Sequence, residues 1–459
     1  MTLALEINDA GLVLARDGTI LAEEPGVAML DRASPETGEA AVLRARLKPL
    51  YAESRYWQDL GTEALARPVP AASNRAEVAY AQLERLVAPH LTDGREIIIA
   101  VPPWYTREQL GLLLGVAEES GLEPVGLVDA GLAASSLEPA PETMLHLELG
   151  LHRAVVTVLD CAAGLRRTRF EMLPQHGWLA LQQAWLDAIA AAFVLKTRFD
   201  PLHQAATEQL LCDGLPAWLA TAVSGGAASI ELESGSATYS VAMSGEDFEG
   251  AASRSYDEYA RVLQRARPTA GPLNLRLSSR FAAFPGLEGR LAGIRNCDIA
   301  RLPRGAAALG ALAWESHIRR DRGALTLVQH LPVALRGGAA TGGAAPPSSV
   351  PMDARPTHLV LASRAYRLDT RPLTLGASVP GDRRAVALEG GPGISRSHCS
   401  ISLVNQSAWL EDHSTYGTFL NGERIGGRVE LRAGDRLRVG SPGVECELVR
   451  VMVDDDGAP

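Results

Sequence analysis

The sequence predicts two folded domains of different class, a larger α/β domain followed by a smaller all-β domain. The chain has 459 residues, which exceeds one ordinary domain. Residues 1–334 mix strand and helix patterns, whereas residues 357–452 are rich in strand patterns. Residues 335–356 are rich in Gly, Ala, Pro and Ser, so we expect a flexible linker that buries no core. Residues 453–459 form an acidic tail.

The larger domain begins with a hairpin pattern. Leu3, Leu5 and Ile7 alternate before a turn at 8–11, and a second strand follows at 12–15. The elements expected after it are a strand at 96–102, a helix at 106–120 with Thr106 as its N-cap and Gly121 after its end, a strand at 124–128, a helix of small residues at 129–136, strands at 144–149 and 154–159, helices at 180–196 and 207–222, and a hairpin at 229–241. This succession indicates an α/β fold.

Composition and charge limit the function classes. The formal net charge of −10 disfavours a nucleic-acid partner or an anionic membrane surface. The five cysteines are scattered, without a CxxC or Cys/His cluster, which argues against a disulfide framework and a metal site. The N-terminus lacks the basic and apolar regions of a signal peptide, and no apolar run approaches the roughly 18 residues that span a bilayer. We therefore expect a cytoplasmic protein without membrane insertion.

Two short segments near the C-terminus carry chemistry suited to an anion. The first is Gly-Ile-Ser-Arg-Ser-His at 393–398, and the second is Asp-His-Ser-Thr-Tyr-Gly-Thr-Phe-Leu-Asn-Gly at 412–422, with 13 residues between them. Hydroxyls and an arginine on adjacent loops can converge on a phosphate dianion, and glycine lets backbone N–H groups approach it closely. The paired segments therefore predict a site that reads phosphate.

These segments resemble the signature of a forkhead-associated (FHA) domain, over roughly residues 355–452. The resemblance implies a β-sandwich that recognises phosphothreonine in partner proteins. It also implies that Ser395 and Thr415 place hydroxyls against the phosphate and that Arg396 flanks the peptide. The positions that hold the loops together in the family are matched by Gly376, His398, Gly417, Thr418, Asn421 and Gly422.

Two departures from the family's pattern bear on phosphate reading. The family's Gly-Arg, whose guanidinium binds the phosphate, reads Gly376-Ala377 here, and the family's peptide-binding Asn reads Tyr416. Losing the guanidinium removes a charge-assisted pair of about 1.5–3 kcal/mol. Arg383 and Arg384 in the next loop are candidates to replace it. The open alternatives are phosphothreonine binding, binding of an unphosphorylated partner, and a structural role.

The larger domain resembles the nucleotide-binding domain of DnaK-type chaperones, in the actin/hexokinase superfamily. Ile-Ile-Ala-Val-Pro-Pro-Trp-Tyr at 98–105 is similar to that family's strand ending in Val-Pro, and 117–134 resembles the stretch that follows it. Residues 304–313 look like the family's final helix, which is rich in Ala and Gly. The order of segments matches over roughly residues 1–320. The resemblance therefore implies an α/β actin-like domain, with the FHA-like domain in place of the family's peptide-binding domain.

The nucleotide cleft that this resemblance implies is degenerate. The family's first phosphate loop, Asp-Leu-Gly-Thr, reads Glu6-Ile7-Asn8-Asp9, and its second, Asp-Leu-Gly-Gly-Gly-Thr, reads Glu-Leu-Gly-Leu-His-Arg at 148–153. Side chains thus replace glycines where phosphate oxygens would lie. The cleft residues that persist are Glu6, Asp129, Glu148 and Gly150. The acids are either a metal- and water-handling set or ordinary polar residues at strand ends. We expect neither a cofactor nor hydrolysis of ATP with Mg²⁺.

The sequence thus favours a noncatalytic signalling or assembly adaptor, a pseudo-ATPase scaffold joined to an FHA-like domain that binds a protein partner. One alternative is a divergent ATPase whose nucleotide state controls FHA docking. Another is a chaperone-like protein that holds client segments without hydrolysis. The domain fusion and the Ala/Gly/Arg-rich composition favour a bacterial source.

Overall fold

The chain divides into two compact units, unit 1 at residues 1–339 and unit 2 at residues 340–459. The computed structural model describes residues 2–137, 143–161, 164–267, 272–320, 325–333, 356–361, 364–377, 384–388, 393–404, 407–415, 417–421, 423–432, 435–440 and 443–449. Residues 335–355 of the expected linker and the tail at 453–459 lie outside this described part.

The first sheet of unit 1 joins three antiparallel strands to parallel ones. Its strands are β1 (Leu3–Glu6), β2 (Leu12–Arg16), β3 (Thr19–Glu24), β9 (Glu96–Val101), β10 (Glu123–Asp129) and β18 (Leu327–Val328). Their order is β3-β2-β1-β9-β10-β18. The strands β1, β2 and β3 run antiparallel, whereas β9 runs parallel to β1 and β10 parallel to β9. The helix α3 (Arg107–Glu119) makes the crossover between β9 and β10.

The second sheet repeats this plan. Its strands are β11 (Thr143–Leu149), β12 (Arg153–Asp160), β13 (Leu165–Pro174), β16 (Leu273–Leu277), β17 (Cys297–Arg301) and β19 (His330–Leu331). The order is β19-β13-β12-β11-β16-β17, with β11, β12 and β13 antiparallel and β16 and β17 parallel to β11. The helix α8 (Leu287–Ala292) makes the crossover between β16 and β17. Five strands of each sheet therefore share one topology, whereas the sixth strand, β18 or β19, extends opposite edges of the two sheets.

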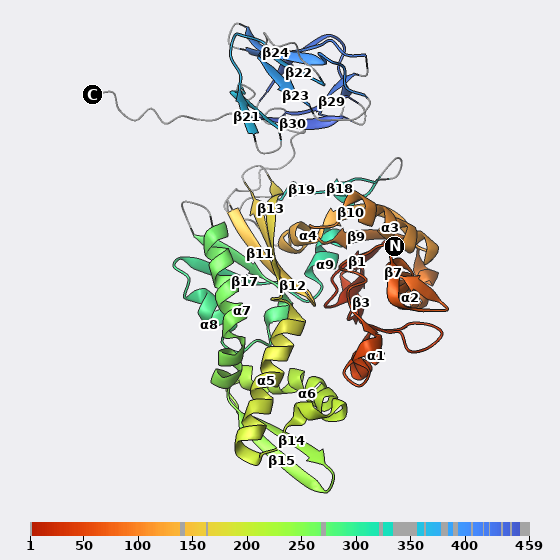
Figure 1. Ribbon diagram of the computed structural model, residues 1–459, viewed down its shortest axis with the longest axis vertical. Coiled ribbons are helices and arrows are strands. Elements are labelled where there is room, and N and C mark those ends of the chain that lie inside the picture. Colours follow the sequence, from red (N-terminus) through yellow and green to blue (C-terminus); the bar gives the residue numbers. More distant parts are fainter. Residues whose placement is uncertain are drawn as a thin grey trace, which may run out of the picture. The chain divides into compact units, whose positions relative to one another are not determined.

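Two helices of small residues, α4 (Ala130–Ser135) and α9 (Ala306–Ala313), lie between these sheets (Figure 1). Their backbones approach so closely that a Cβ at Gly310 would lie 1.9 Å from the carbonyl oxygen of Ala133. Their side chains share one core cluster with residues of both sheets, such as Ile98 and Met144. The small residues predicted at 129–136 and 304–313 thus allow the two halves of unit 1 to pack closely.

Each sheet carries an inserted segment. Between β3 and β9 the elements are β4 (Ala28–Met29), β5 (Glu36–Thr37), α1 (Glu39–Ala45), η1 (Pro49–Tyr51), β6 (Ala52–Glu53), β7 (Ala64–Val69), β8 (Ala72–Asn74), α2 (Arg75–Val87) and η2 (Ala88–Asp93). Between β13 and β16 they are α5 (Trp178–Thr197), η3 (Pro201–His203), α6 (Ala205–Val223), the hairpin β14 (Ala228–Ser234) and β15 (Ala237–Met243), and α7 (Gly245–Ala266). The remaining elements of unit 1 are η4 (Ser279–Phe281) and α10 (Glu315–Ile318).

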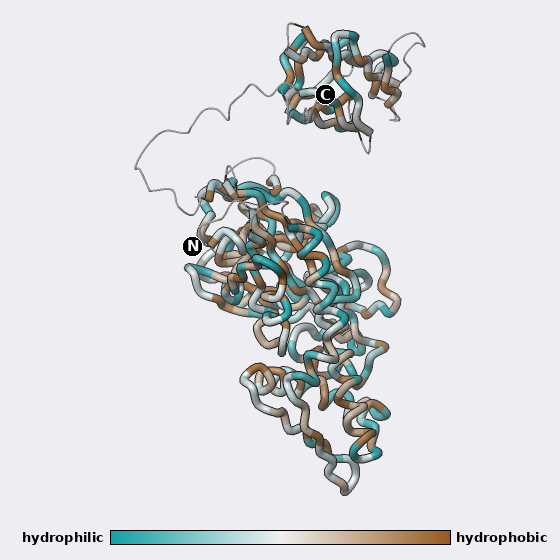
Figure 2. Tube along the Cα trace, turned by 90° about the vertical axis from the view of Figure 1, so that its left-hand side faces the viewer, coloured by the Kyte–Doolittle hydropathy of each residue, from teal (hydrophilic) through white to brown (hydrophobic). Residues whose placement is uncertain are grey.

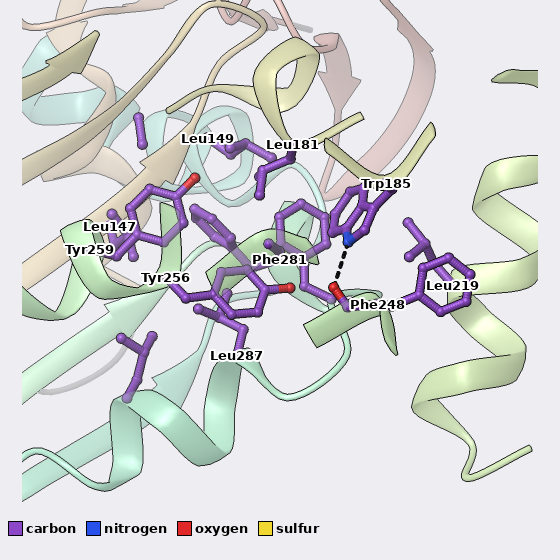
Figure 3. Packing of buried hydrophobic residues seen from close by; sticks show 14 of the residues in the cluster. Leu147, Leu149, Leu181, Trp185, Leu219, Phe248, Tyr256, Tyr259, Phe281 and Leu287 are labelled. Atoms are coloured by element: carbon purple, nitrogen blue, oxygen red, sulfur yellow. Dashed lines mark hydrogen bonds between the residues drawn. The ribbon is translucent and has the colours of Figure 1, made fainter. Parts of the chain in front are cut away.

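Aromatic residues fill the core beside the second sheet. Trp185 is fully buried and donates its indole N–H to the carbonyl oxygen of Phe248 at 2.9 Å, so its polar edge is satisfied (Figure 3). Tyr256, Tyr259 and Phe281 pack in the same cluster. Hydrophobic and hydrophilic residues alternate over short distances along the Cα trace (Figure 2), as expected where each element presents one face to a core.

The helix α5 corrects one expectation. It has 20 residues and a mean hydropathy of 1.4 over an 18-residue window, so by length and composition alone it could cross a membrane. The expectation that no segment reaches this threshold is therefore wrong. Leu181, Leu186, Ile189 and Phe193 of α5 are nevertheless buried in the core of unit 1, as in many core helices of water-soluble domains.

Unit 2 consists of strands throughout its described part. One sheet has the order β21-β20-β30-β29-β26-β27, and the other has the order β23-β22-β24-β25-β28. The strands are β20 (His358–Leu361), β21 (Arg364–Arg367), β22 (Leu373–Gly376), β23 (Ala385–Ala387), β24 (Cys399–Val404), β25 (Ser407–Asp412), β26 (Thr418–Leu420), β27 (Glu423–Arg424), β28 (Arg428–Leu431), β29 (Arg436–Val439) and β30 (Val444–Val449). Leu359 and Leu448 of one sheet share a core with Leu375 and Leu410 of the other, which makes unit 2 a sandwich.

Candidate functional site

The loop before β24 carries Ser395 and Arg396 and lies directly on the end of β22. Ala377 donates its N–H to the carbonyl oxygen of Ser395 at 3.0 Å. A Cβ at Gly376 would lie 2.1 Å from the carbonyl oxygen of Arg396, so only glycine lets the loop approach this strand. The position of this loop therefore depends on one residue without a side chain, Gly376.

His398 connects this loop to the next one. Its side chain is fully buried, and its Nδ1 accepts the N–H of Ser395 at 3.0 Å. Its Nε2 lies 3.1 Å from the carbonyl oxygen of Gly417, which can only accept, so this nitrogen carries the proton. The imidazole of His398 therefore joins the two predicted segments through both of its ring nitrogens.

The second loop is held by side chains that bond to its own backbone. Asp412 accepts the hydroxyl of Thr418 at 2.7 Å and the N–H of Ser414 at 3.1 Å. Partial burial raises the pKa of Asp412, but these hydrogen bonds outweigh it and lower the pKa below its ordinary value. The Ser414 hydroxyl accepts the N–H of Gly417, which has a φ of 87°, a conformation that favours glycine.

Asn421 holds a turn farther along the chain. It has a φ of 51°, and its side-chain oxygen accepts the N–H of Arg436 at 2.9 Å. Its amide nitrogen donates to Asp435 at 2.9 Å. The position thus connects β26 to β29. Gly422 and Tyr416, also singled out in the sequence, lie outside the described residues.

The two loops bring the predicted ligand-binding groups together. The hydroxyl oxygen of Ser395 accepts the N–H of Thr415 at 3.3 Å, so the two residues are direct neighbours. Thr415 and Arg396 are exposed, and among the described residues Arg396 makes no ion pair. An exposed hydroxyl, a half-buried hydroxyl and an unpaired guanidinium can together bind an anion.

The arginines proposed to replace the family's guanidinium are not equivalent. Arg384 pairs with Asp369 at 2.7 Å and also donates to the carbonyl oxygen of Arg367, so it is already bound to the protein. Arg383 lies outside the described residues. The structure therefore gives Arg384 a structural partner instead of a place beside Ser395.

The cleft residues of unit 1 meet around a buried arginine. Arg280, on η4, lies 2.8 Å from Glu6 of β1 and 3.3 Å from Glu148 of β11, and it donates to the carbonyl oxygen of Gly11 at 2.7 Å. Burial lowers the pKa of Arg280, but the two carboxylates outweigh it and raise the pKa. Burial raises the pKa of Glu6, which Arg280 partly offsets. The guanidinium thus connects the two sheets of unit 1. No local sequence pattern points to this role, because the partners of Arg280 are remote along the chain.

The two turns that resemble phosphate loops bond to each other. Asp9 accepts the N–H of Leu151 at 2.7 Å, and Asn8 donates to the carbonyl oxygen of Leu149 at 3.1 Å. A Cβ at Gly150 would lie 2.6 Å from the Asp9 carboxylate. Burial raises the pKa of Asp9 to about 6. A carboxylate of the protein itself therefore occupies the backbone donor that a bound anion would need.

Asp129 lies apart from this cluster, at the N-cap of α4. Its side chain accepts the N–H of Leu132 at 2.9 Å, and it pairs with Arg167 at 3.3 Å. Burial raises its pKa, and Arg167 partly offsets that effect. Asp129 thus has a capping role and a cationic partner.

The cavity beside the two turns of the cleft is small. The cavity bordered by Glu6, Asn8, His146 and Glu148 has a volume of about 30 Å³, which suits one or two water molecules. Burial lowers the pKa of His146 to about 4, so this imidazole is neutral at pH 7. Within the described residues, no group of three or more His, Cys, Asp or Glu side chains could hold a metal ion.

Unit 1 has a larger apolar pocket, which is bordered by Arg280. Its volume of about 630 Å³ suits a small ligand, and its walls include Val27, Val42, Leu151, Trp178 and Pro216. Its Arg46 is already paired with Glu208 at 2.9 Å. The pocket therefore offers shape and apolar surface, whereas the charge of Arg46 is neutralised by the protein.

Comparison with known families identifies part of unit 2. Residues 373–440 match the model of the FHA domain family, and this range contains Ser395, Arg396 and Thr415. No curated protein matches the chain. The prediction of a C-terminal FHA domain is therefore confirmed, and with it the presence of a noncatalytic protein-interaction module. The resemblance of residues 1–320 to DnaK-type chaperones stays a prediction.

Proposed function

We propose that this protein is a noncatalytic signalling or assembly adaptor, which recognises a threonine-phosphorylated protein through its FHA domain. One observation carries this proposal. The hydroxyl of Ser395 and the backbone of Thr415 are hydrogen-bonded across two loops, beside the exposed and unpaired guanidinium of Arg396. A phosphothreonine carries a charge near −2 and three acceptor oxygens, which hydroxyls, an N–H group and a guanidinium can bind together.

For unit 1 we propose a degenerate actin/hexokinase-type fold that serves as a scaffold. The repeated topology of the two sheets supports this assignment. The bonds among Asp9, Leu151, Arg280 and the two glutamates support the absence of ATPase activity, because they occupy the groups that a nucleotide and its metal would need. We also propose a cytoplasmic location, which the five unpaired cysteines support, and a bacterial source, which the domain fusion and the Ala/Gly/Arg-rich composition support.

Peptide titration with the full chain tests phosphate reading. A phosphothreonine peptide chosen from a degenerate library is compared with its unphosphorylated form, on the wild type and on Ser395→Ala, Arg396→Ala and Thr415→Ala. Each substitution should weaken only the phosphorylated peptide, by about 1–3 kcal/mol. Ala377→Arg should strengthen the phosphorylated peptide. Equal affinity of the wild type for both peptides would overturn the proposal.

The alternative is an ATPase whose nucleotide state controls FHA docking, and calorimetry with ATP and Mg²⁺ separates it from the scaffold. We expect no micromolar binding, because Asp9 occupies the Leu151 N–H and Arg280 is paired with Glu6 and Glu148, so the groups that would bind phosphates are already taken. Micromolar binding that Glu148→Ala abolishes would favour the ATPase.

A further inference from the structure

The arginines around the recognition loops differ in what they already bind. Arg384 is neutralised by Asp369, at 2.7 Å. Arg396 and Arg424 are both exposed, and neither makes an ion pair among the described residues. Ala377, at the end of β22, carries no charge. Among the described residues at these loops, Arg396 and Arg424 are therefore cations free to meet a ligand.

The position of Arg424 is set by the strand that carries it. Arg424 pairs with Phe419 in the β26–β27 hairpin, and the next residue, Ile425, donates its N–H to the carbonyl oxygen of Thr418 at 2.9 Å. These bonds hold the backbone of Arg424 beside the end of the loop that carries Thr415. The side chain therefore starts from a fixed point close to the predicted ligand groups.

The guanidinium of Arg424 lies over the backbone of Gly417. A Cβ built at Gly417 would lie 2.6 Å from Nε, 3.1 Å from Cζ and 3.2 Å from Nη2 of Arg424. Gly417 follows Thr415 by two residues, and the N–H of Thr415 bonds to Ser395. The absence of a side chain at Gly417 thus gives the guanidinium room over the loop that carries Thr415.

We propose that Arg424 supplies a second phosphate-binding guanidinium, so that it and Arg396 grip the phosphate of a phosphothreonine peptide from two different elements. This inference rests on the proposed function. A phosphate group near −2 in charge is not neutralised by one arginine, and a guanidinium can donate two parallel hydrogen bonds to phosphate oxygens. Arg424 would therefore add both charge and orientation to the hydroxyls of Ser395 and Thr415.

The test uses the full chain and the phosphothreonine peptide selected above, with its unphosphorylated form. The variants are Arg424→Ala, Arg424→Lys and the control Arg371→Ala, which removes an exposed arginine at the opposite end of β22 from Gly376. Arg424→Ala should weaken the phosphorylated peptide about tenfold or more and leave the unphosphorylated peptide unchanged. Arg424→Lys should restore part of the loss, and Arg371→Ala should change neither affinity.

The dependence on pH gives a readout that a packing role would not move. Phosphothreonine gains a proton near pH 6, so its charge falls as the pH drops from 7.5 to 5. The affinity ratio between wild type and Arg424→Ala should shrink over this range if the guanidinium binds the dianion. A ratio that does not depend on pH would contradict the inference.

The other outcomes are distinguishable. A wild type that does not prefer the phosphorylated peptide overturns the proposed function, and this inference with it. A wild type that prefers the phosphorylated peptide, with Arg424→Ala retaining the full preference, overturns this inference alone. Equal weakening of both peptides assigns Arg424 a structural role and also overturns it. Thermal unfolding of each variant identifies any that fails to fold, and Arg424→Lys then decides the question.

Discussion

The cleft of unit 1 and the recognition loops of unit 2 are built from similar groups, namely glycine turns, backbone N–H donors and arginines. In the cleft, the Leu151 N–H is bound by Asp9, and Arg280 lies between Glu6 and Glu148. In the loops, by contrast, Arg396 is exposed and makes no ion pair among the described residues. The cleft therefore pairs its charged groups with one another, although Glu6, Asp9 and Arg280 each keep one buried polar atom without a hydrogen-bond partner among the described residues. The loops, by contrast, present theirs to solvent.

This difference teaches how to weigh a motif that resembles a binding site. Burial makes an unpaired charge costly, so a binding site that loses its ligand must recruit partners from the protein itself. Once those partners are in place, a ligand has to displace them as well as bind. An exposed loop has no such requirement, because water solvates its groups until a ligand arrives. Partners inside the protein are thus stronger evidence about a degenerate site than the motif is.

The largest expected effect comes from removing the buried cation of the cleft. Arg280→Met leaves the carboxylates of Glu6 and Glu148 without their cationic partner. The substitution should destabilise unit 1 by about 3–5 kcal/mol. Scanning calorimetry on the full chain measures this, because unit 1 should unfold at a lower temperature. Arg261→Met is the control, since Arg261 pairs with Glu258 on the surface and should contribute about 0–1 kcal/mol.

Adding Glu6→Gln to Arg280→Met should recover part of the lost stability, because it removes one of the two unpaired charges. If Arg280→Met lowered the stability of unit 1 no more than Arg261→Met does, the cleft would be solvated and open. The contrast with the recognition loops would then disappear.

The helix contact between the two halves of unit 1 should be nearly as sensitive. Gly310→Ala places a Cβ 1.9 Å from the carbonyl oxygen of Ala133, so the backbones of α4 and α9 must separate, at a cost of up to about 3 kcal/mol. Chemical denaturation, monitored by tryptophan fluorescence, measures this change in the free energy of unfolding. Gly111→Ala in α3 is the matched control, because a Cβ there meets nothing within 4 Å and should stabilise by up to about 1 kcal/mol. Similar effects from both substitutions would rule out a close contact.

The buried carboxylate of the cleft should give a stabilising substitution. The pKa of Asp9 is raised from 3.8 to about 6, so the folded state binds the proton more tightly than the unfolded state does. Raising the pH from about 4 to 6 therefore lowers the stability, and above pH 6 the cost stays constant. Asp9→Asn keeps an oxygen for the Leu151 N–H and should stabilise unit 1 at pH 7 by up to about 3 kcal/mol.

This gain should be much smaller at pH 4 than at pH 7 and should vanish well below pH 3.8, where Asp9 is protonated in both states. Urea titrations at pH 4 and pH 7 measure the difference. The control is Asp17→Asn, an exposed position whose φ of 51° suits Asn equally well. A gain that is equal at both pH values would assign the effect to something other than the buried charge.

The smallest effect concerns the loop that carries Ser395. Gly376→Ala places a Cβ 2.1 Å from the carbonyl oxygen of Arg396, so the loop must shift away from β22. The affinity for the phosphorylated peptide should fall about tenfold, while unit 1 unfolds at its usual temperature. Gly426→Ala is the control, because a Cβ there meets nothing within 4 Å. Unchanged affinity for Gly376→Ala would show that the position of this loop does not matter for binding.

The sequence by itself determined the local features of this protein. The alternation at 3–7 and 12–15 predicted the first hairpin, and Thr106 predicted the start of α3, where it forms a capping box with Gln109. The spacing of the two C-terminal segments predicted the FHA domain that spans residues 373–440. These predictions succeeded because each depends on residues close together in the chain. The strand β13 was not predicted, because half of its ten residues, Leu-Arg-Arg-Thr-Arg-Phe-Glu-Met-Leu-Pro, are exposed and half are polar, without a regular alternation.

Only the tertiary structure decided what the polar groups bind. Asp9 and Leu151 are 142 positions apart, and Arg280 and Gly11 are 269 positions apart, so no local pattern announces either contact. The sequence likewise suggested Arg384 as a phosphate-binding group, whereas the fold pairs it with Asp369 and places Arg424 over Gly417. Local propensity specifies strands, turns and caps, but the partner of a charge depends on which distant segments the packing brings within about 4 Å.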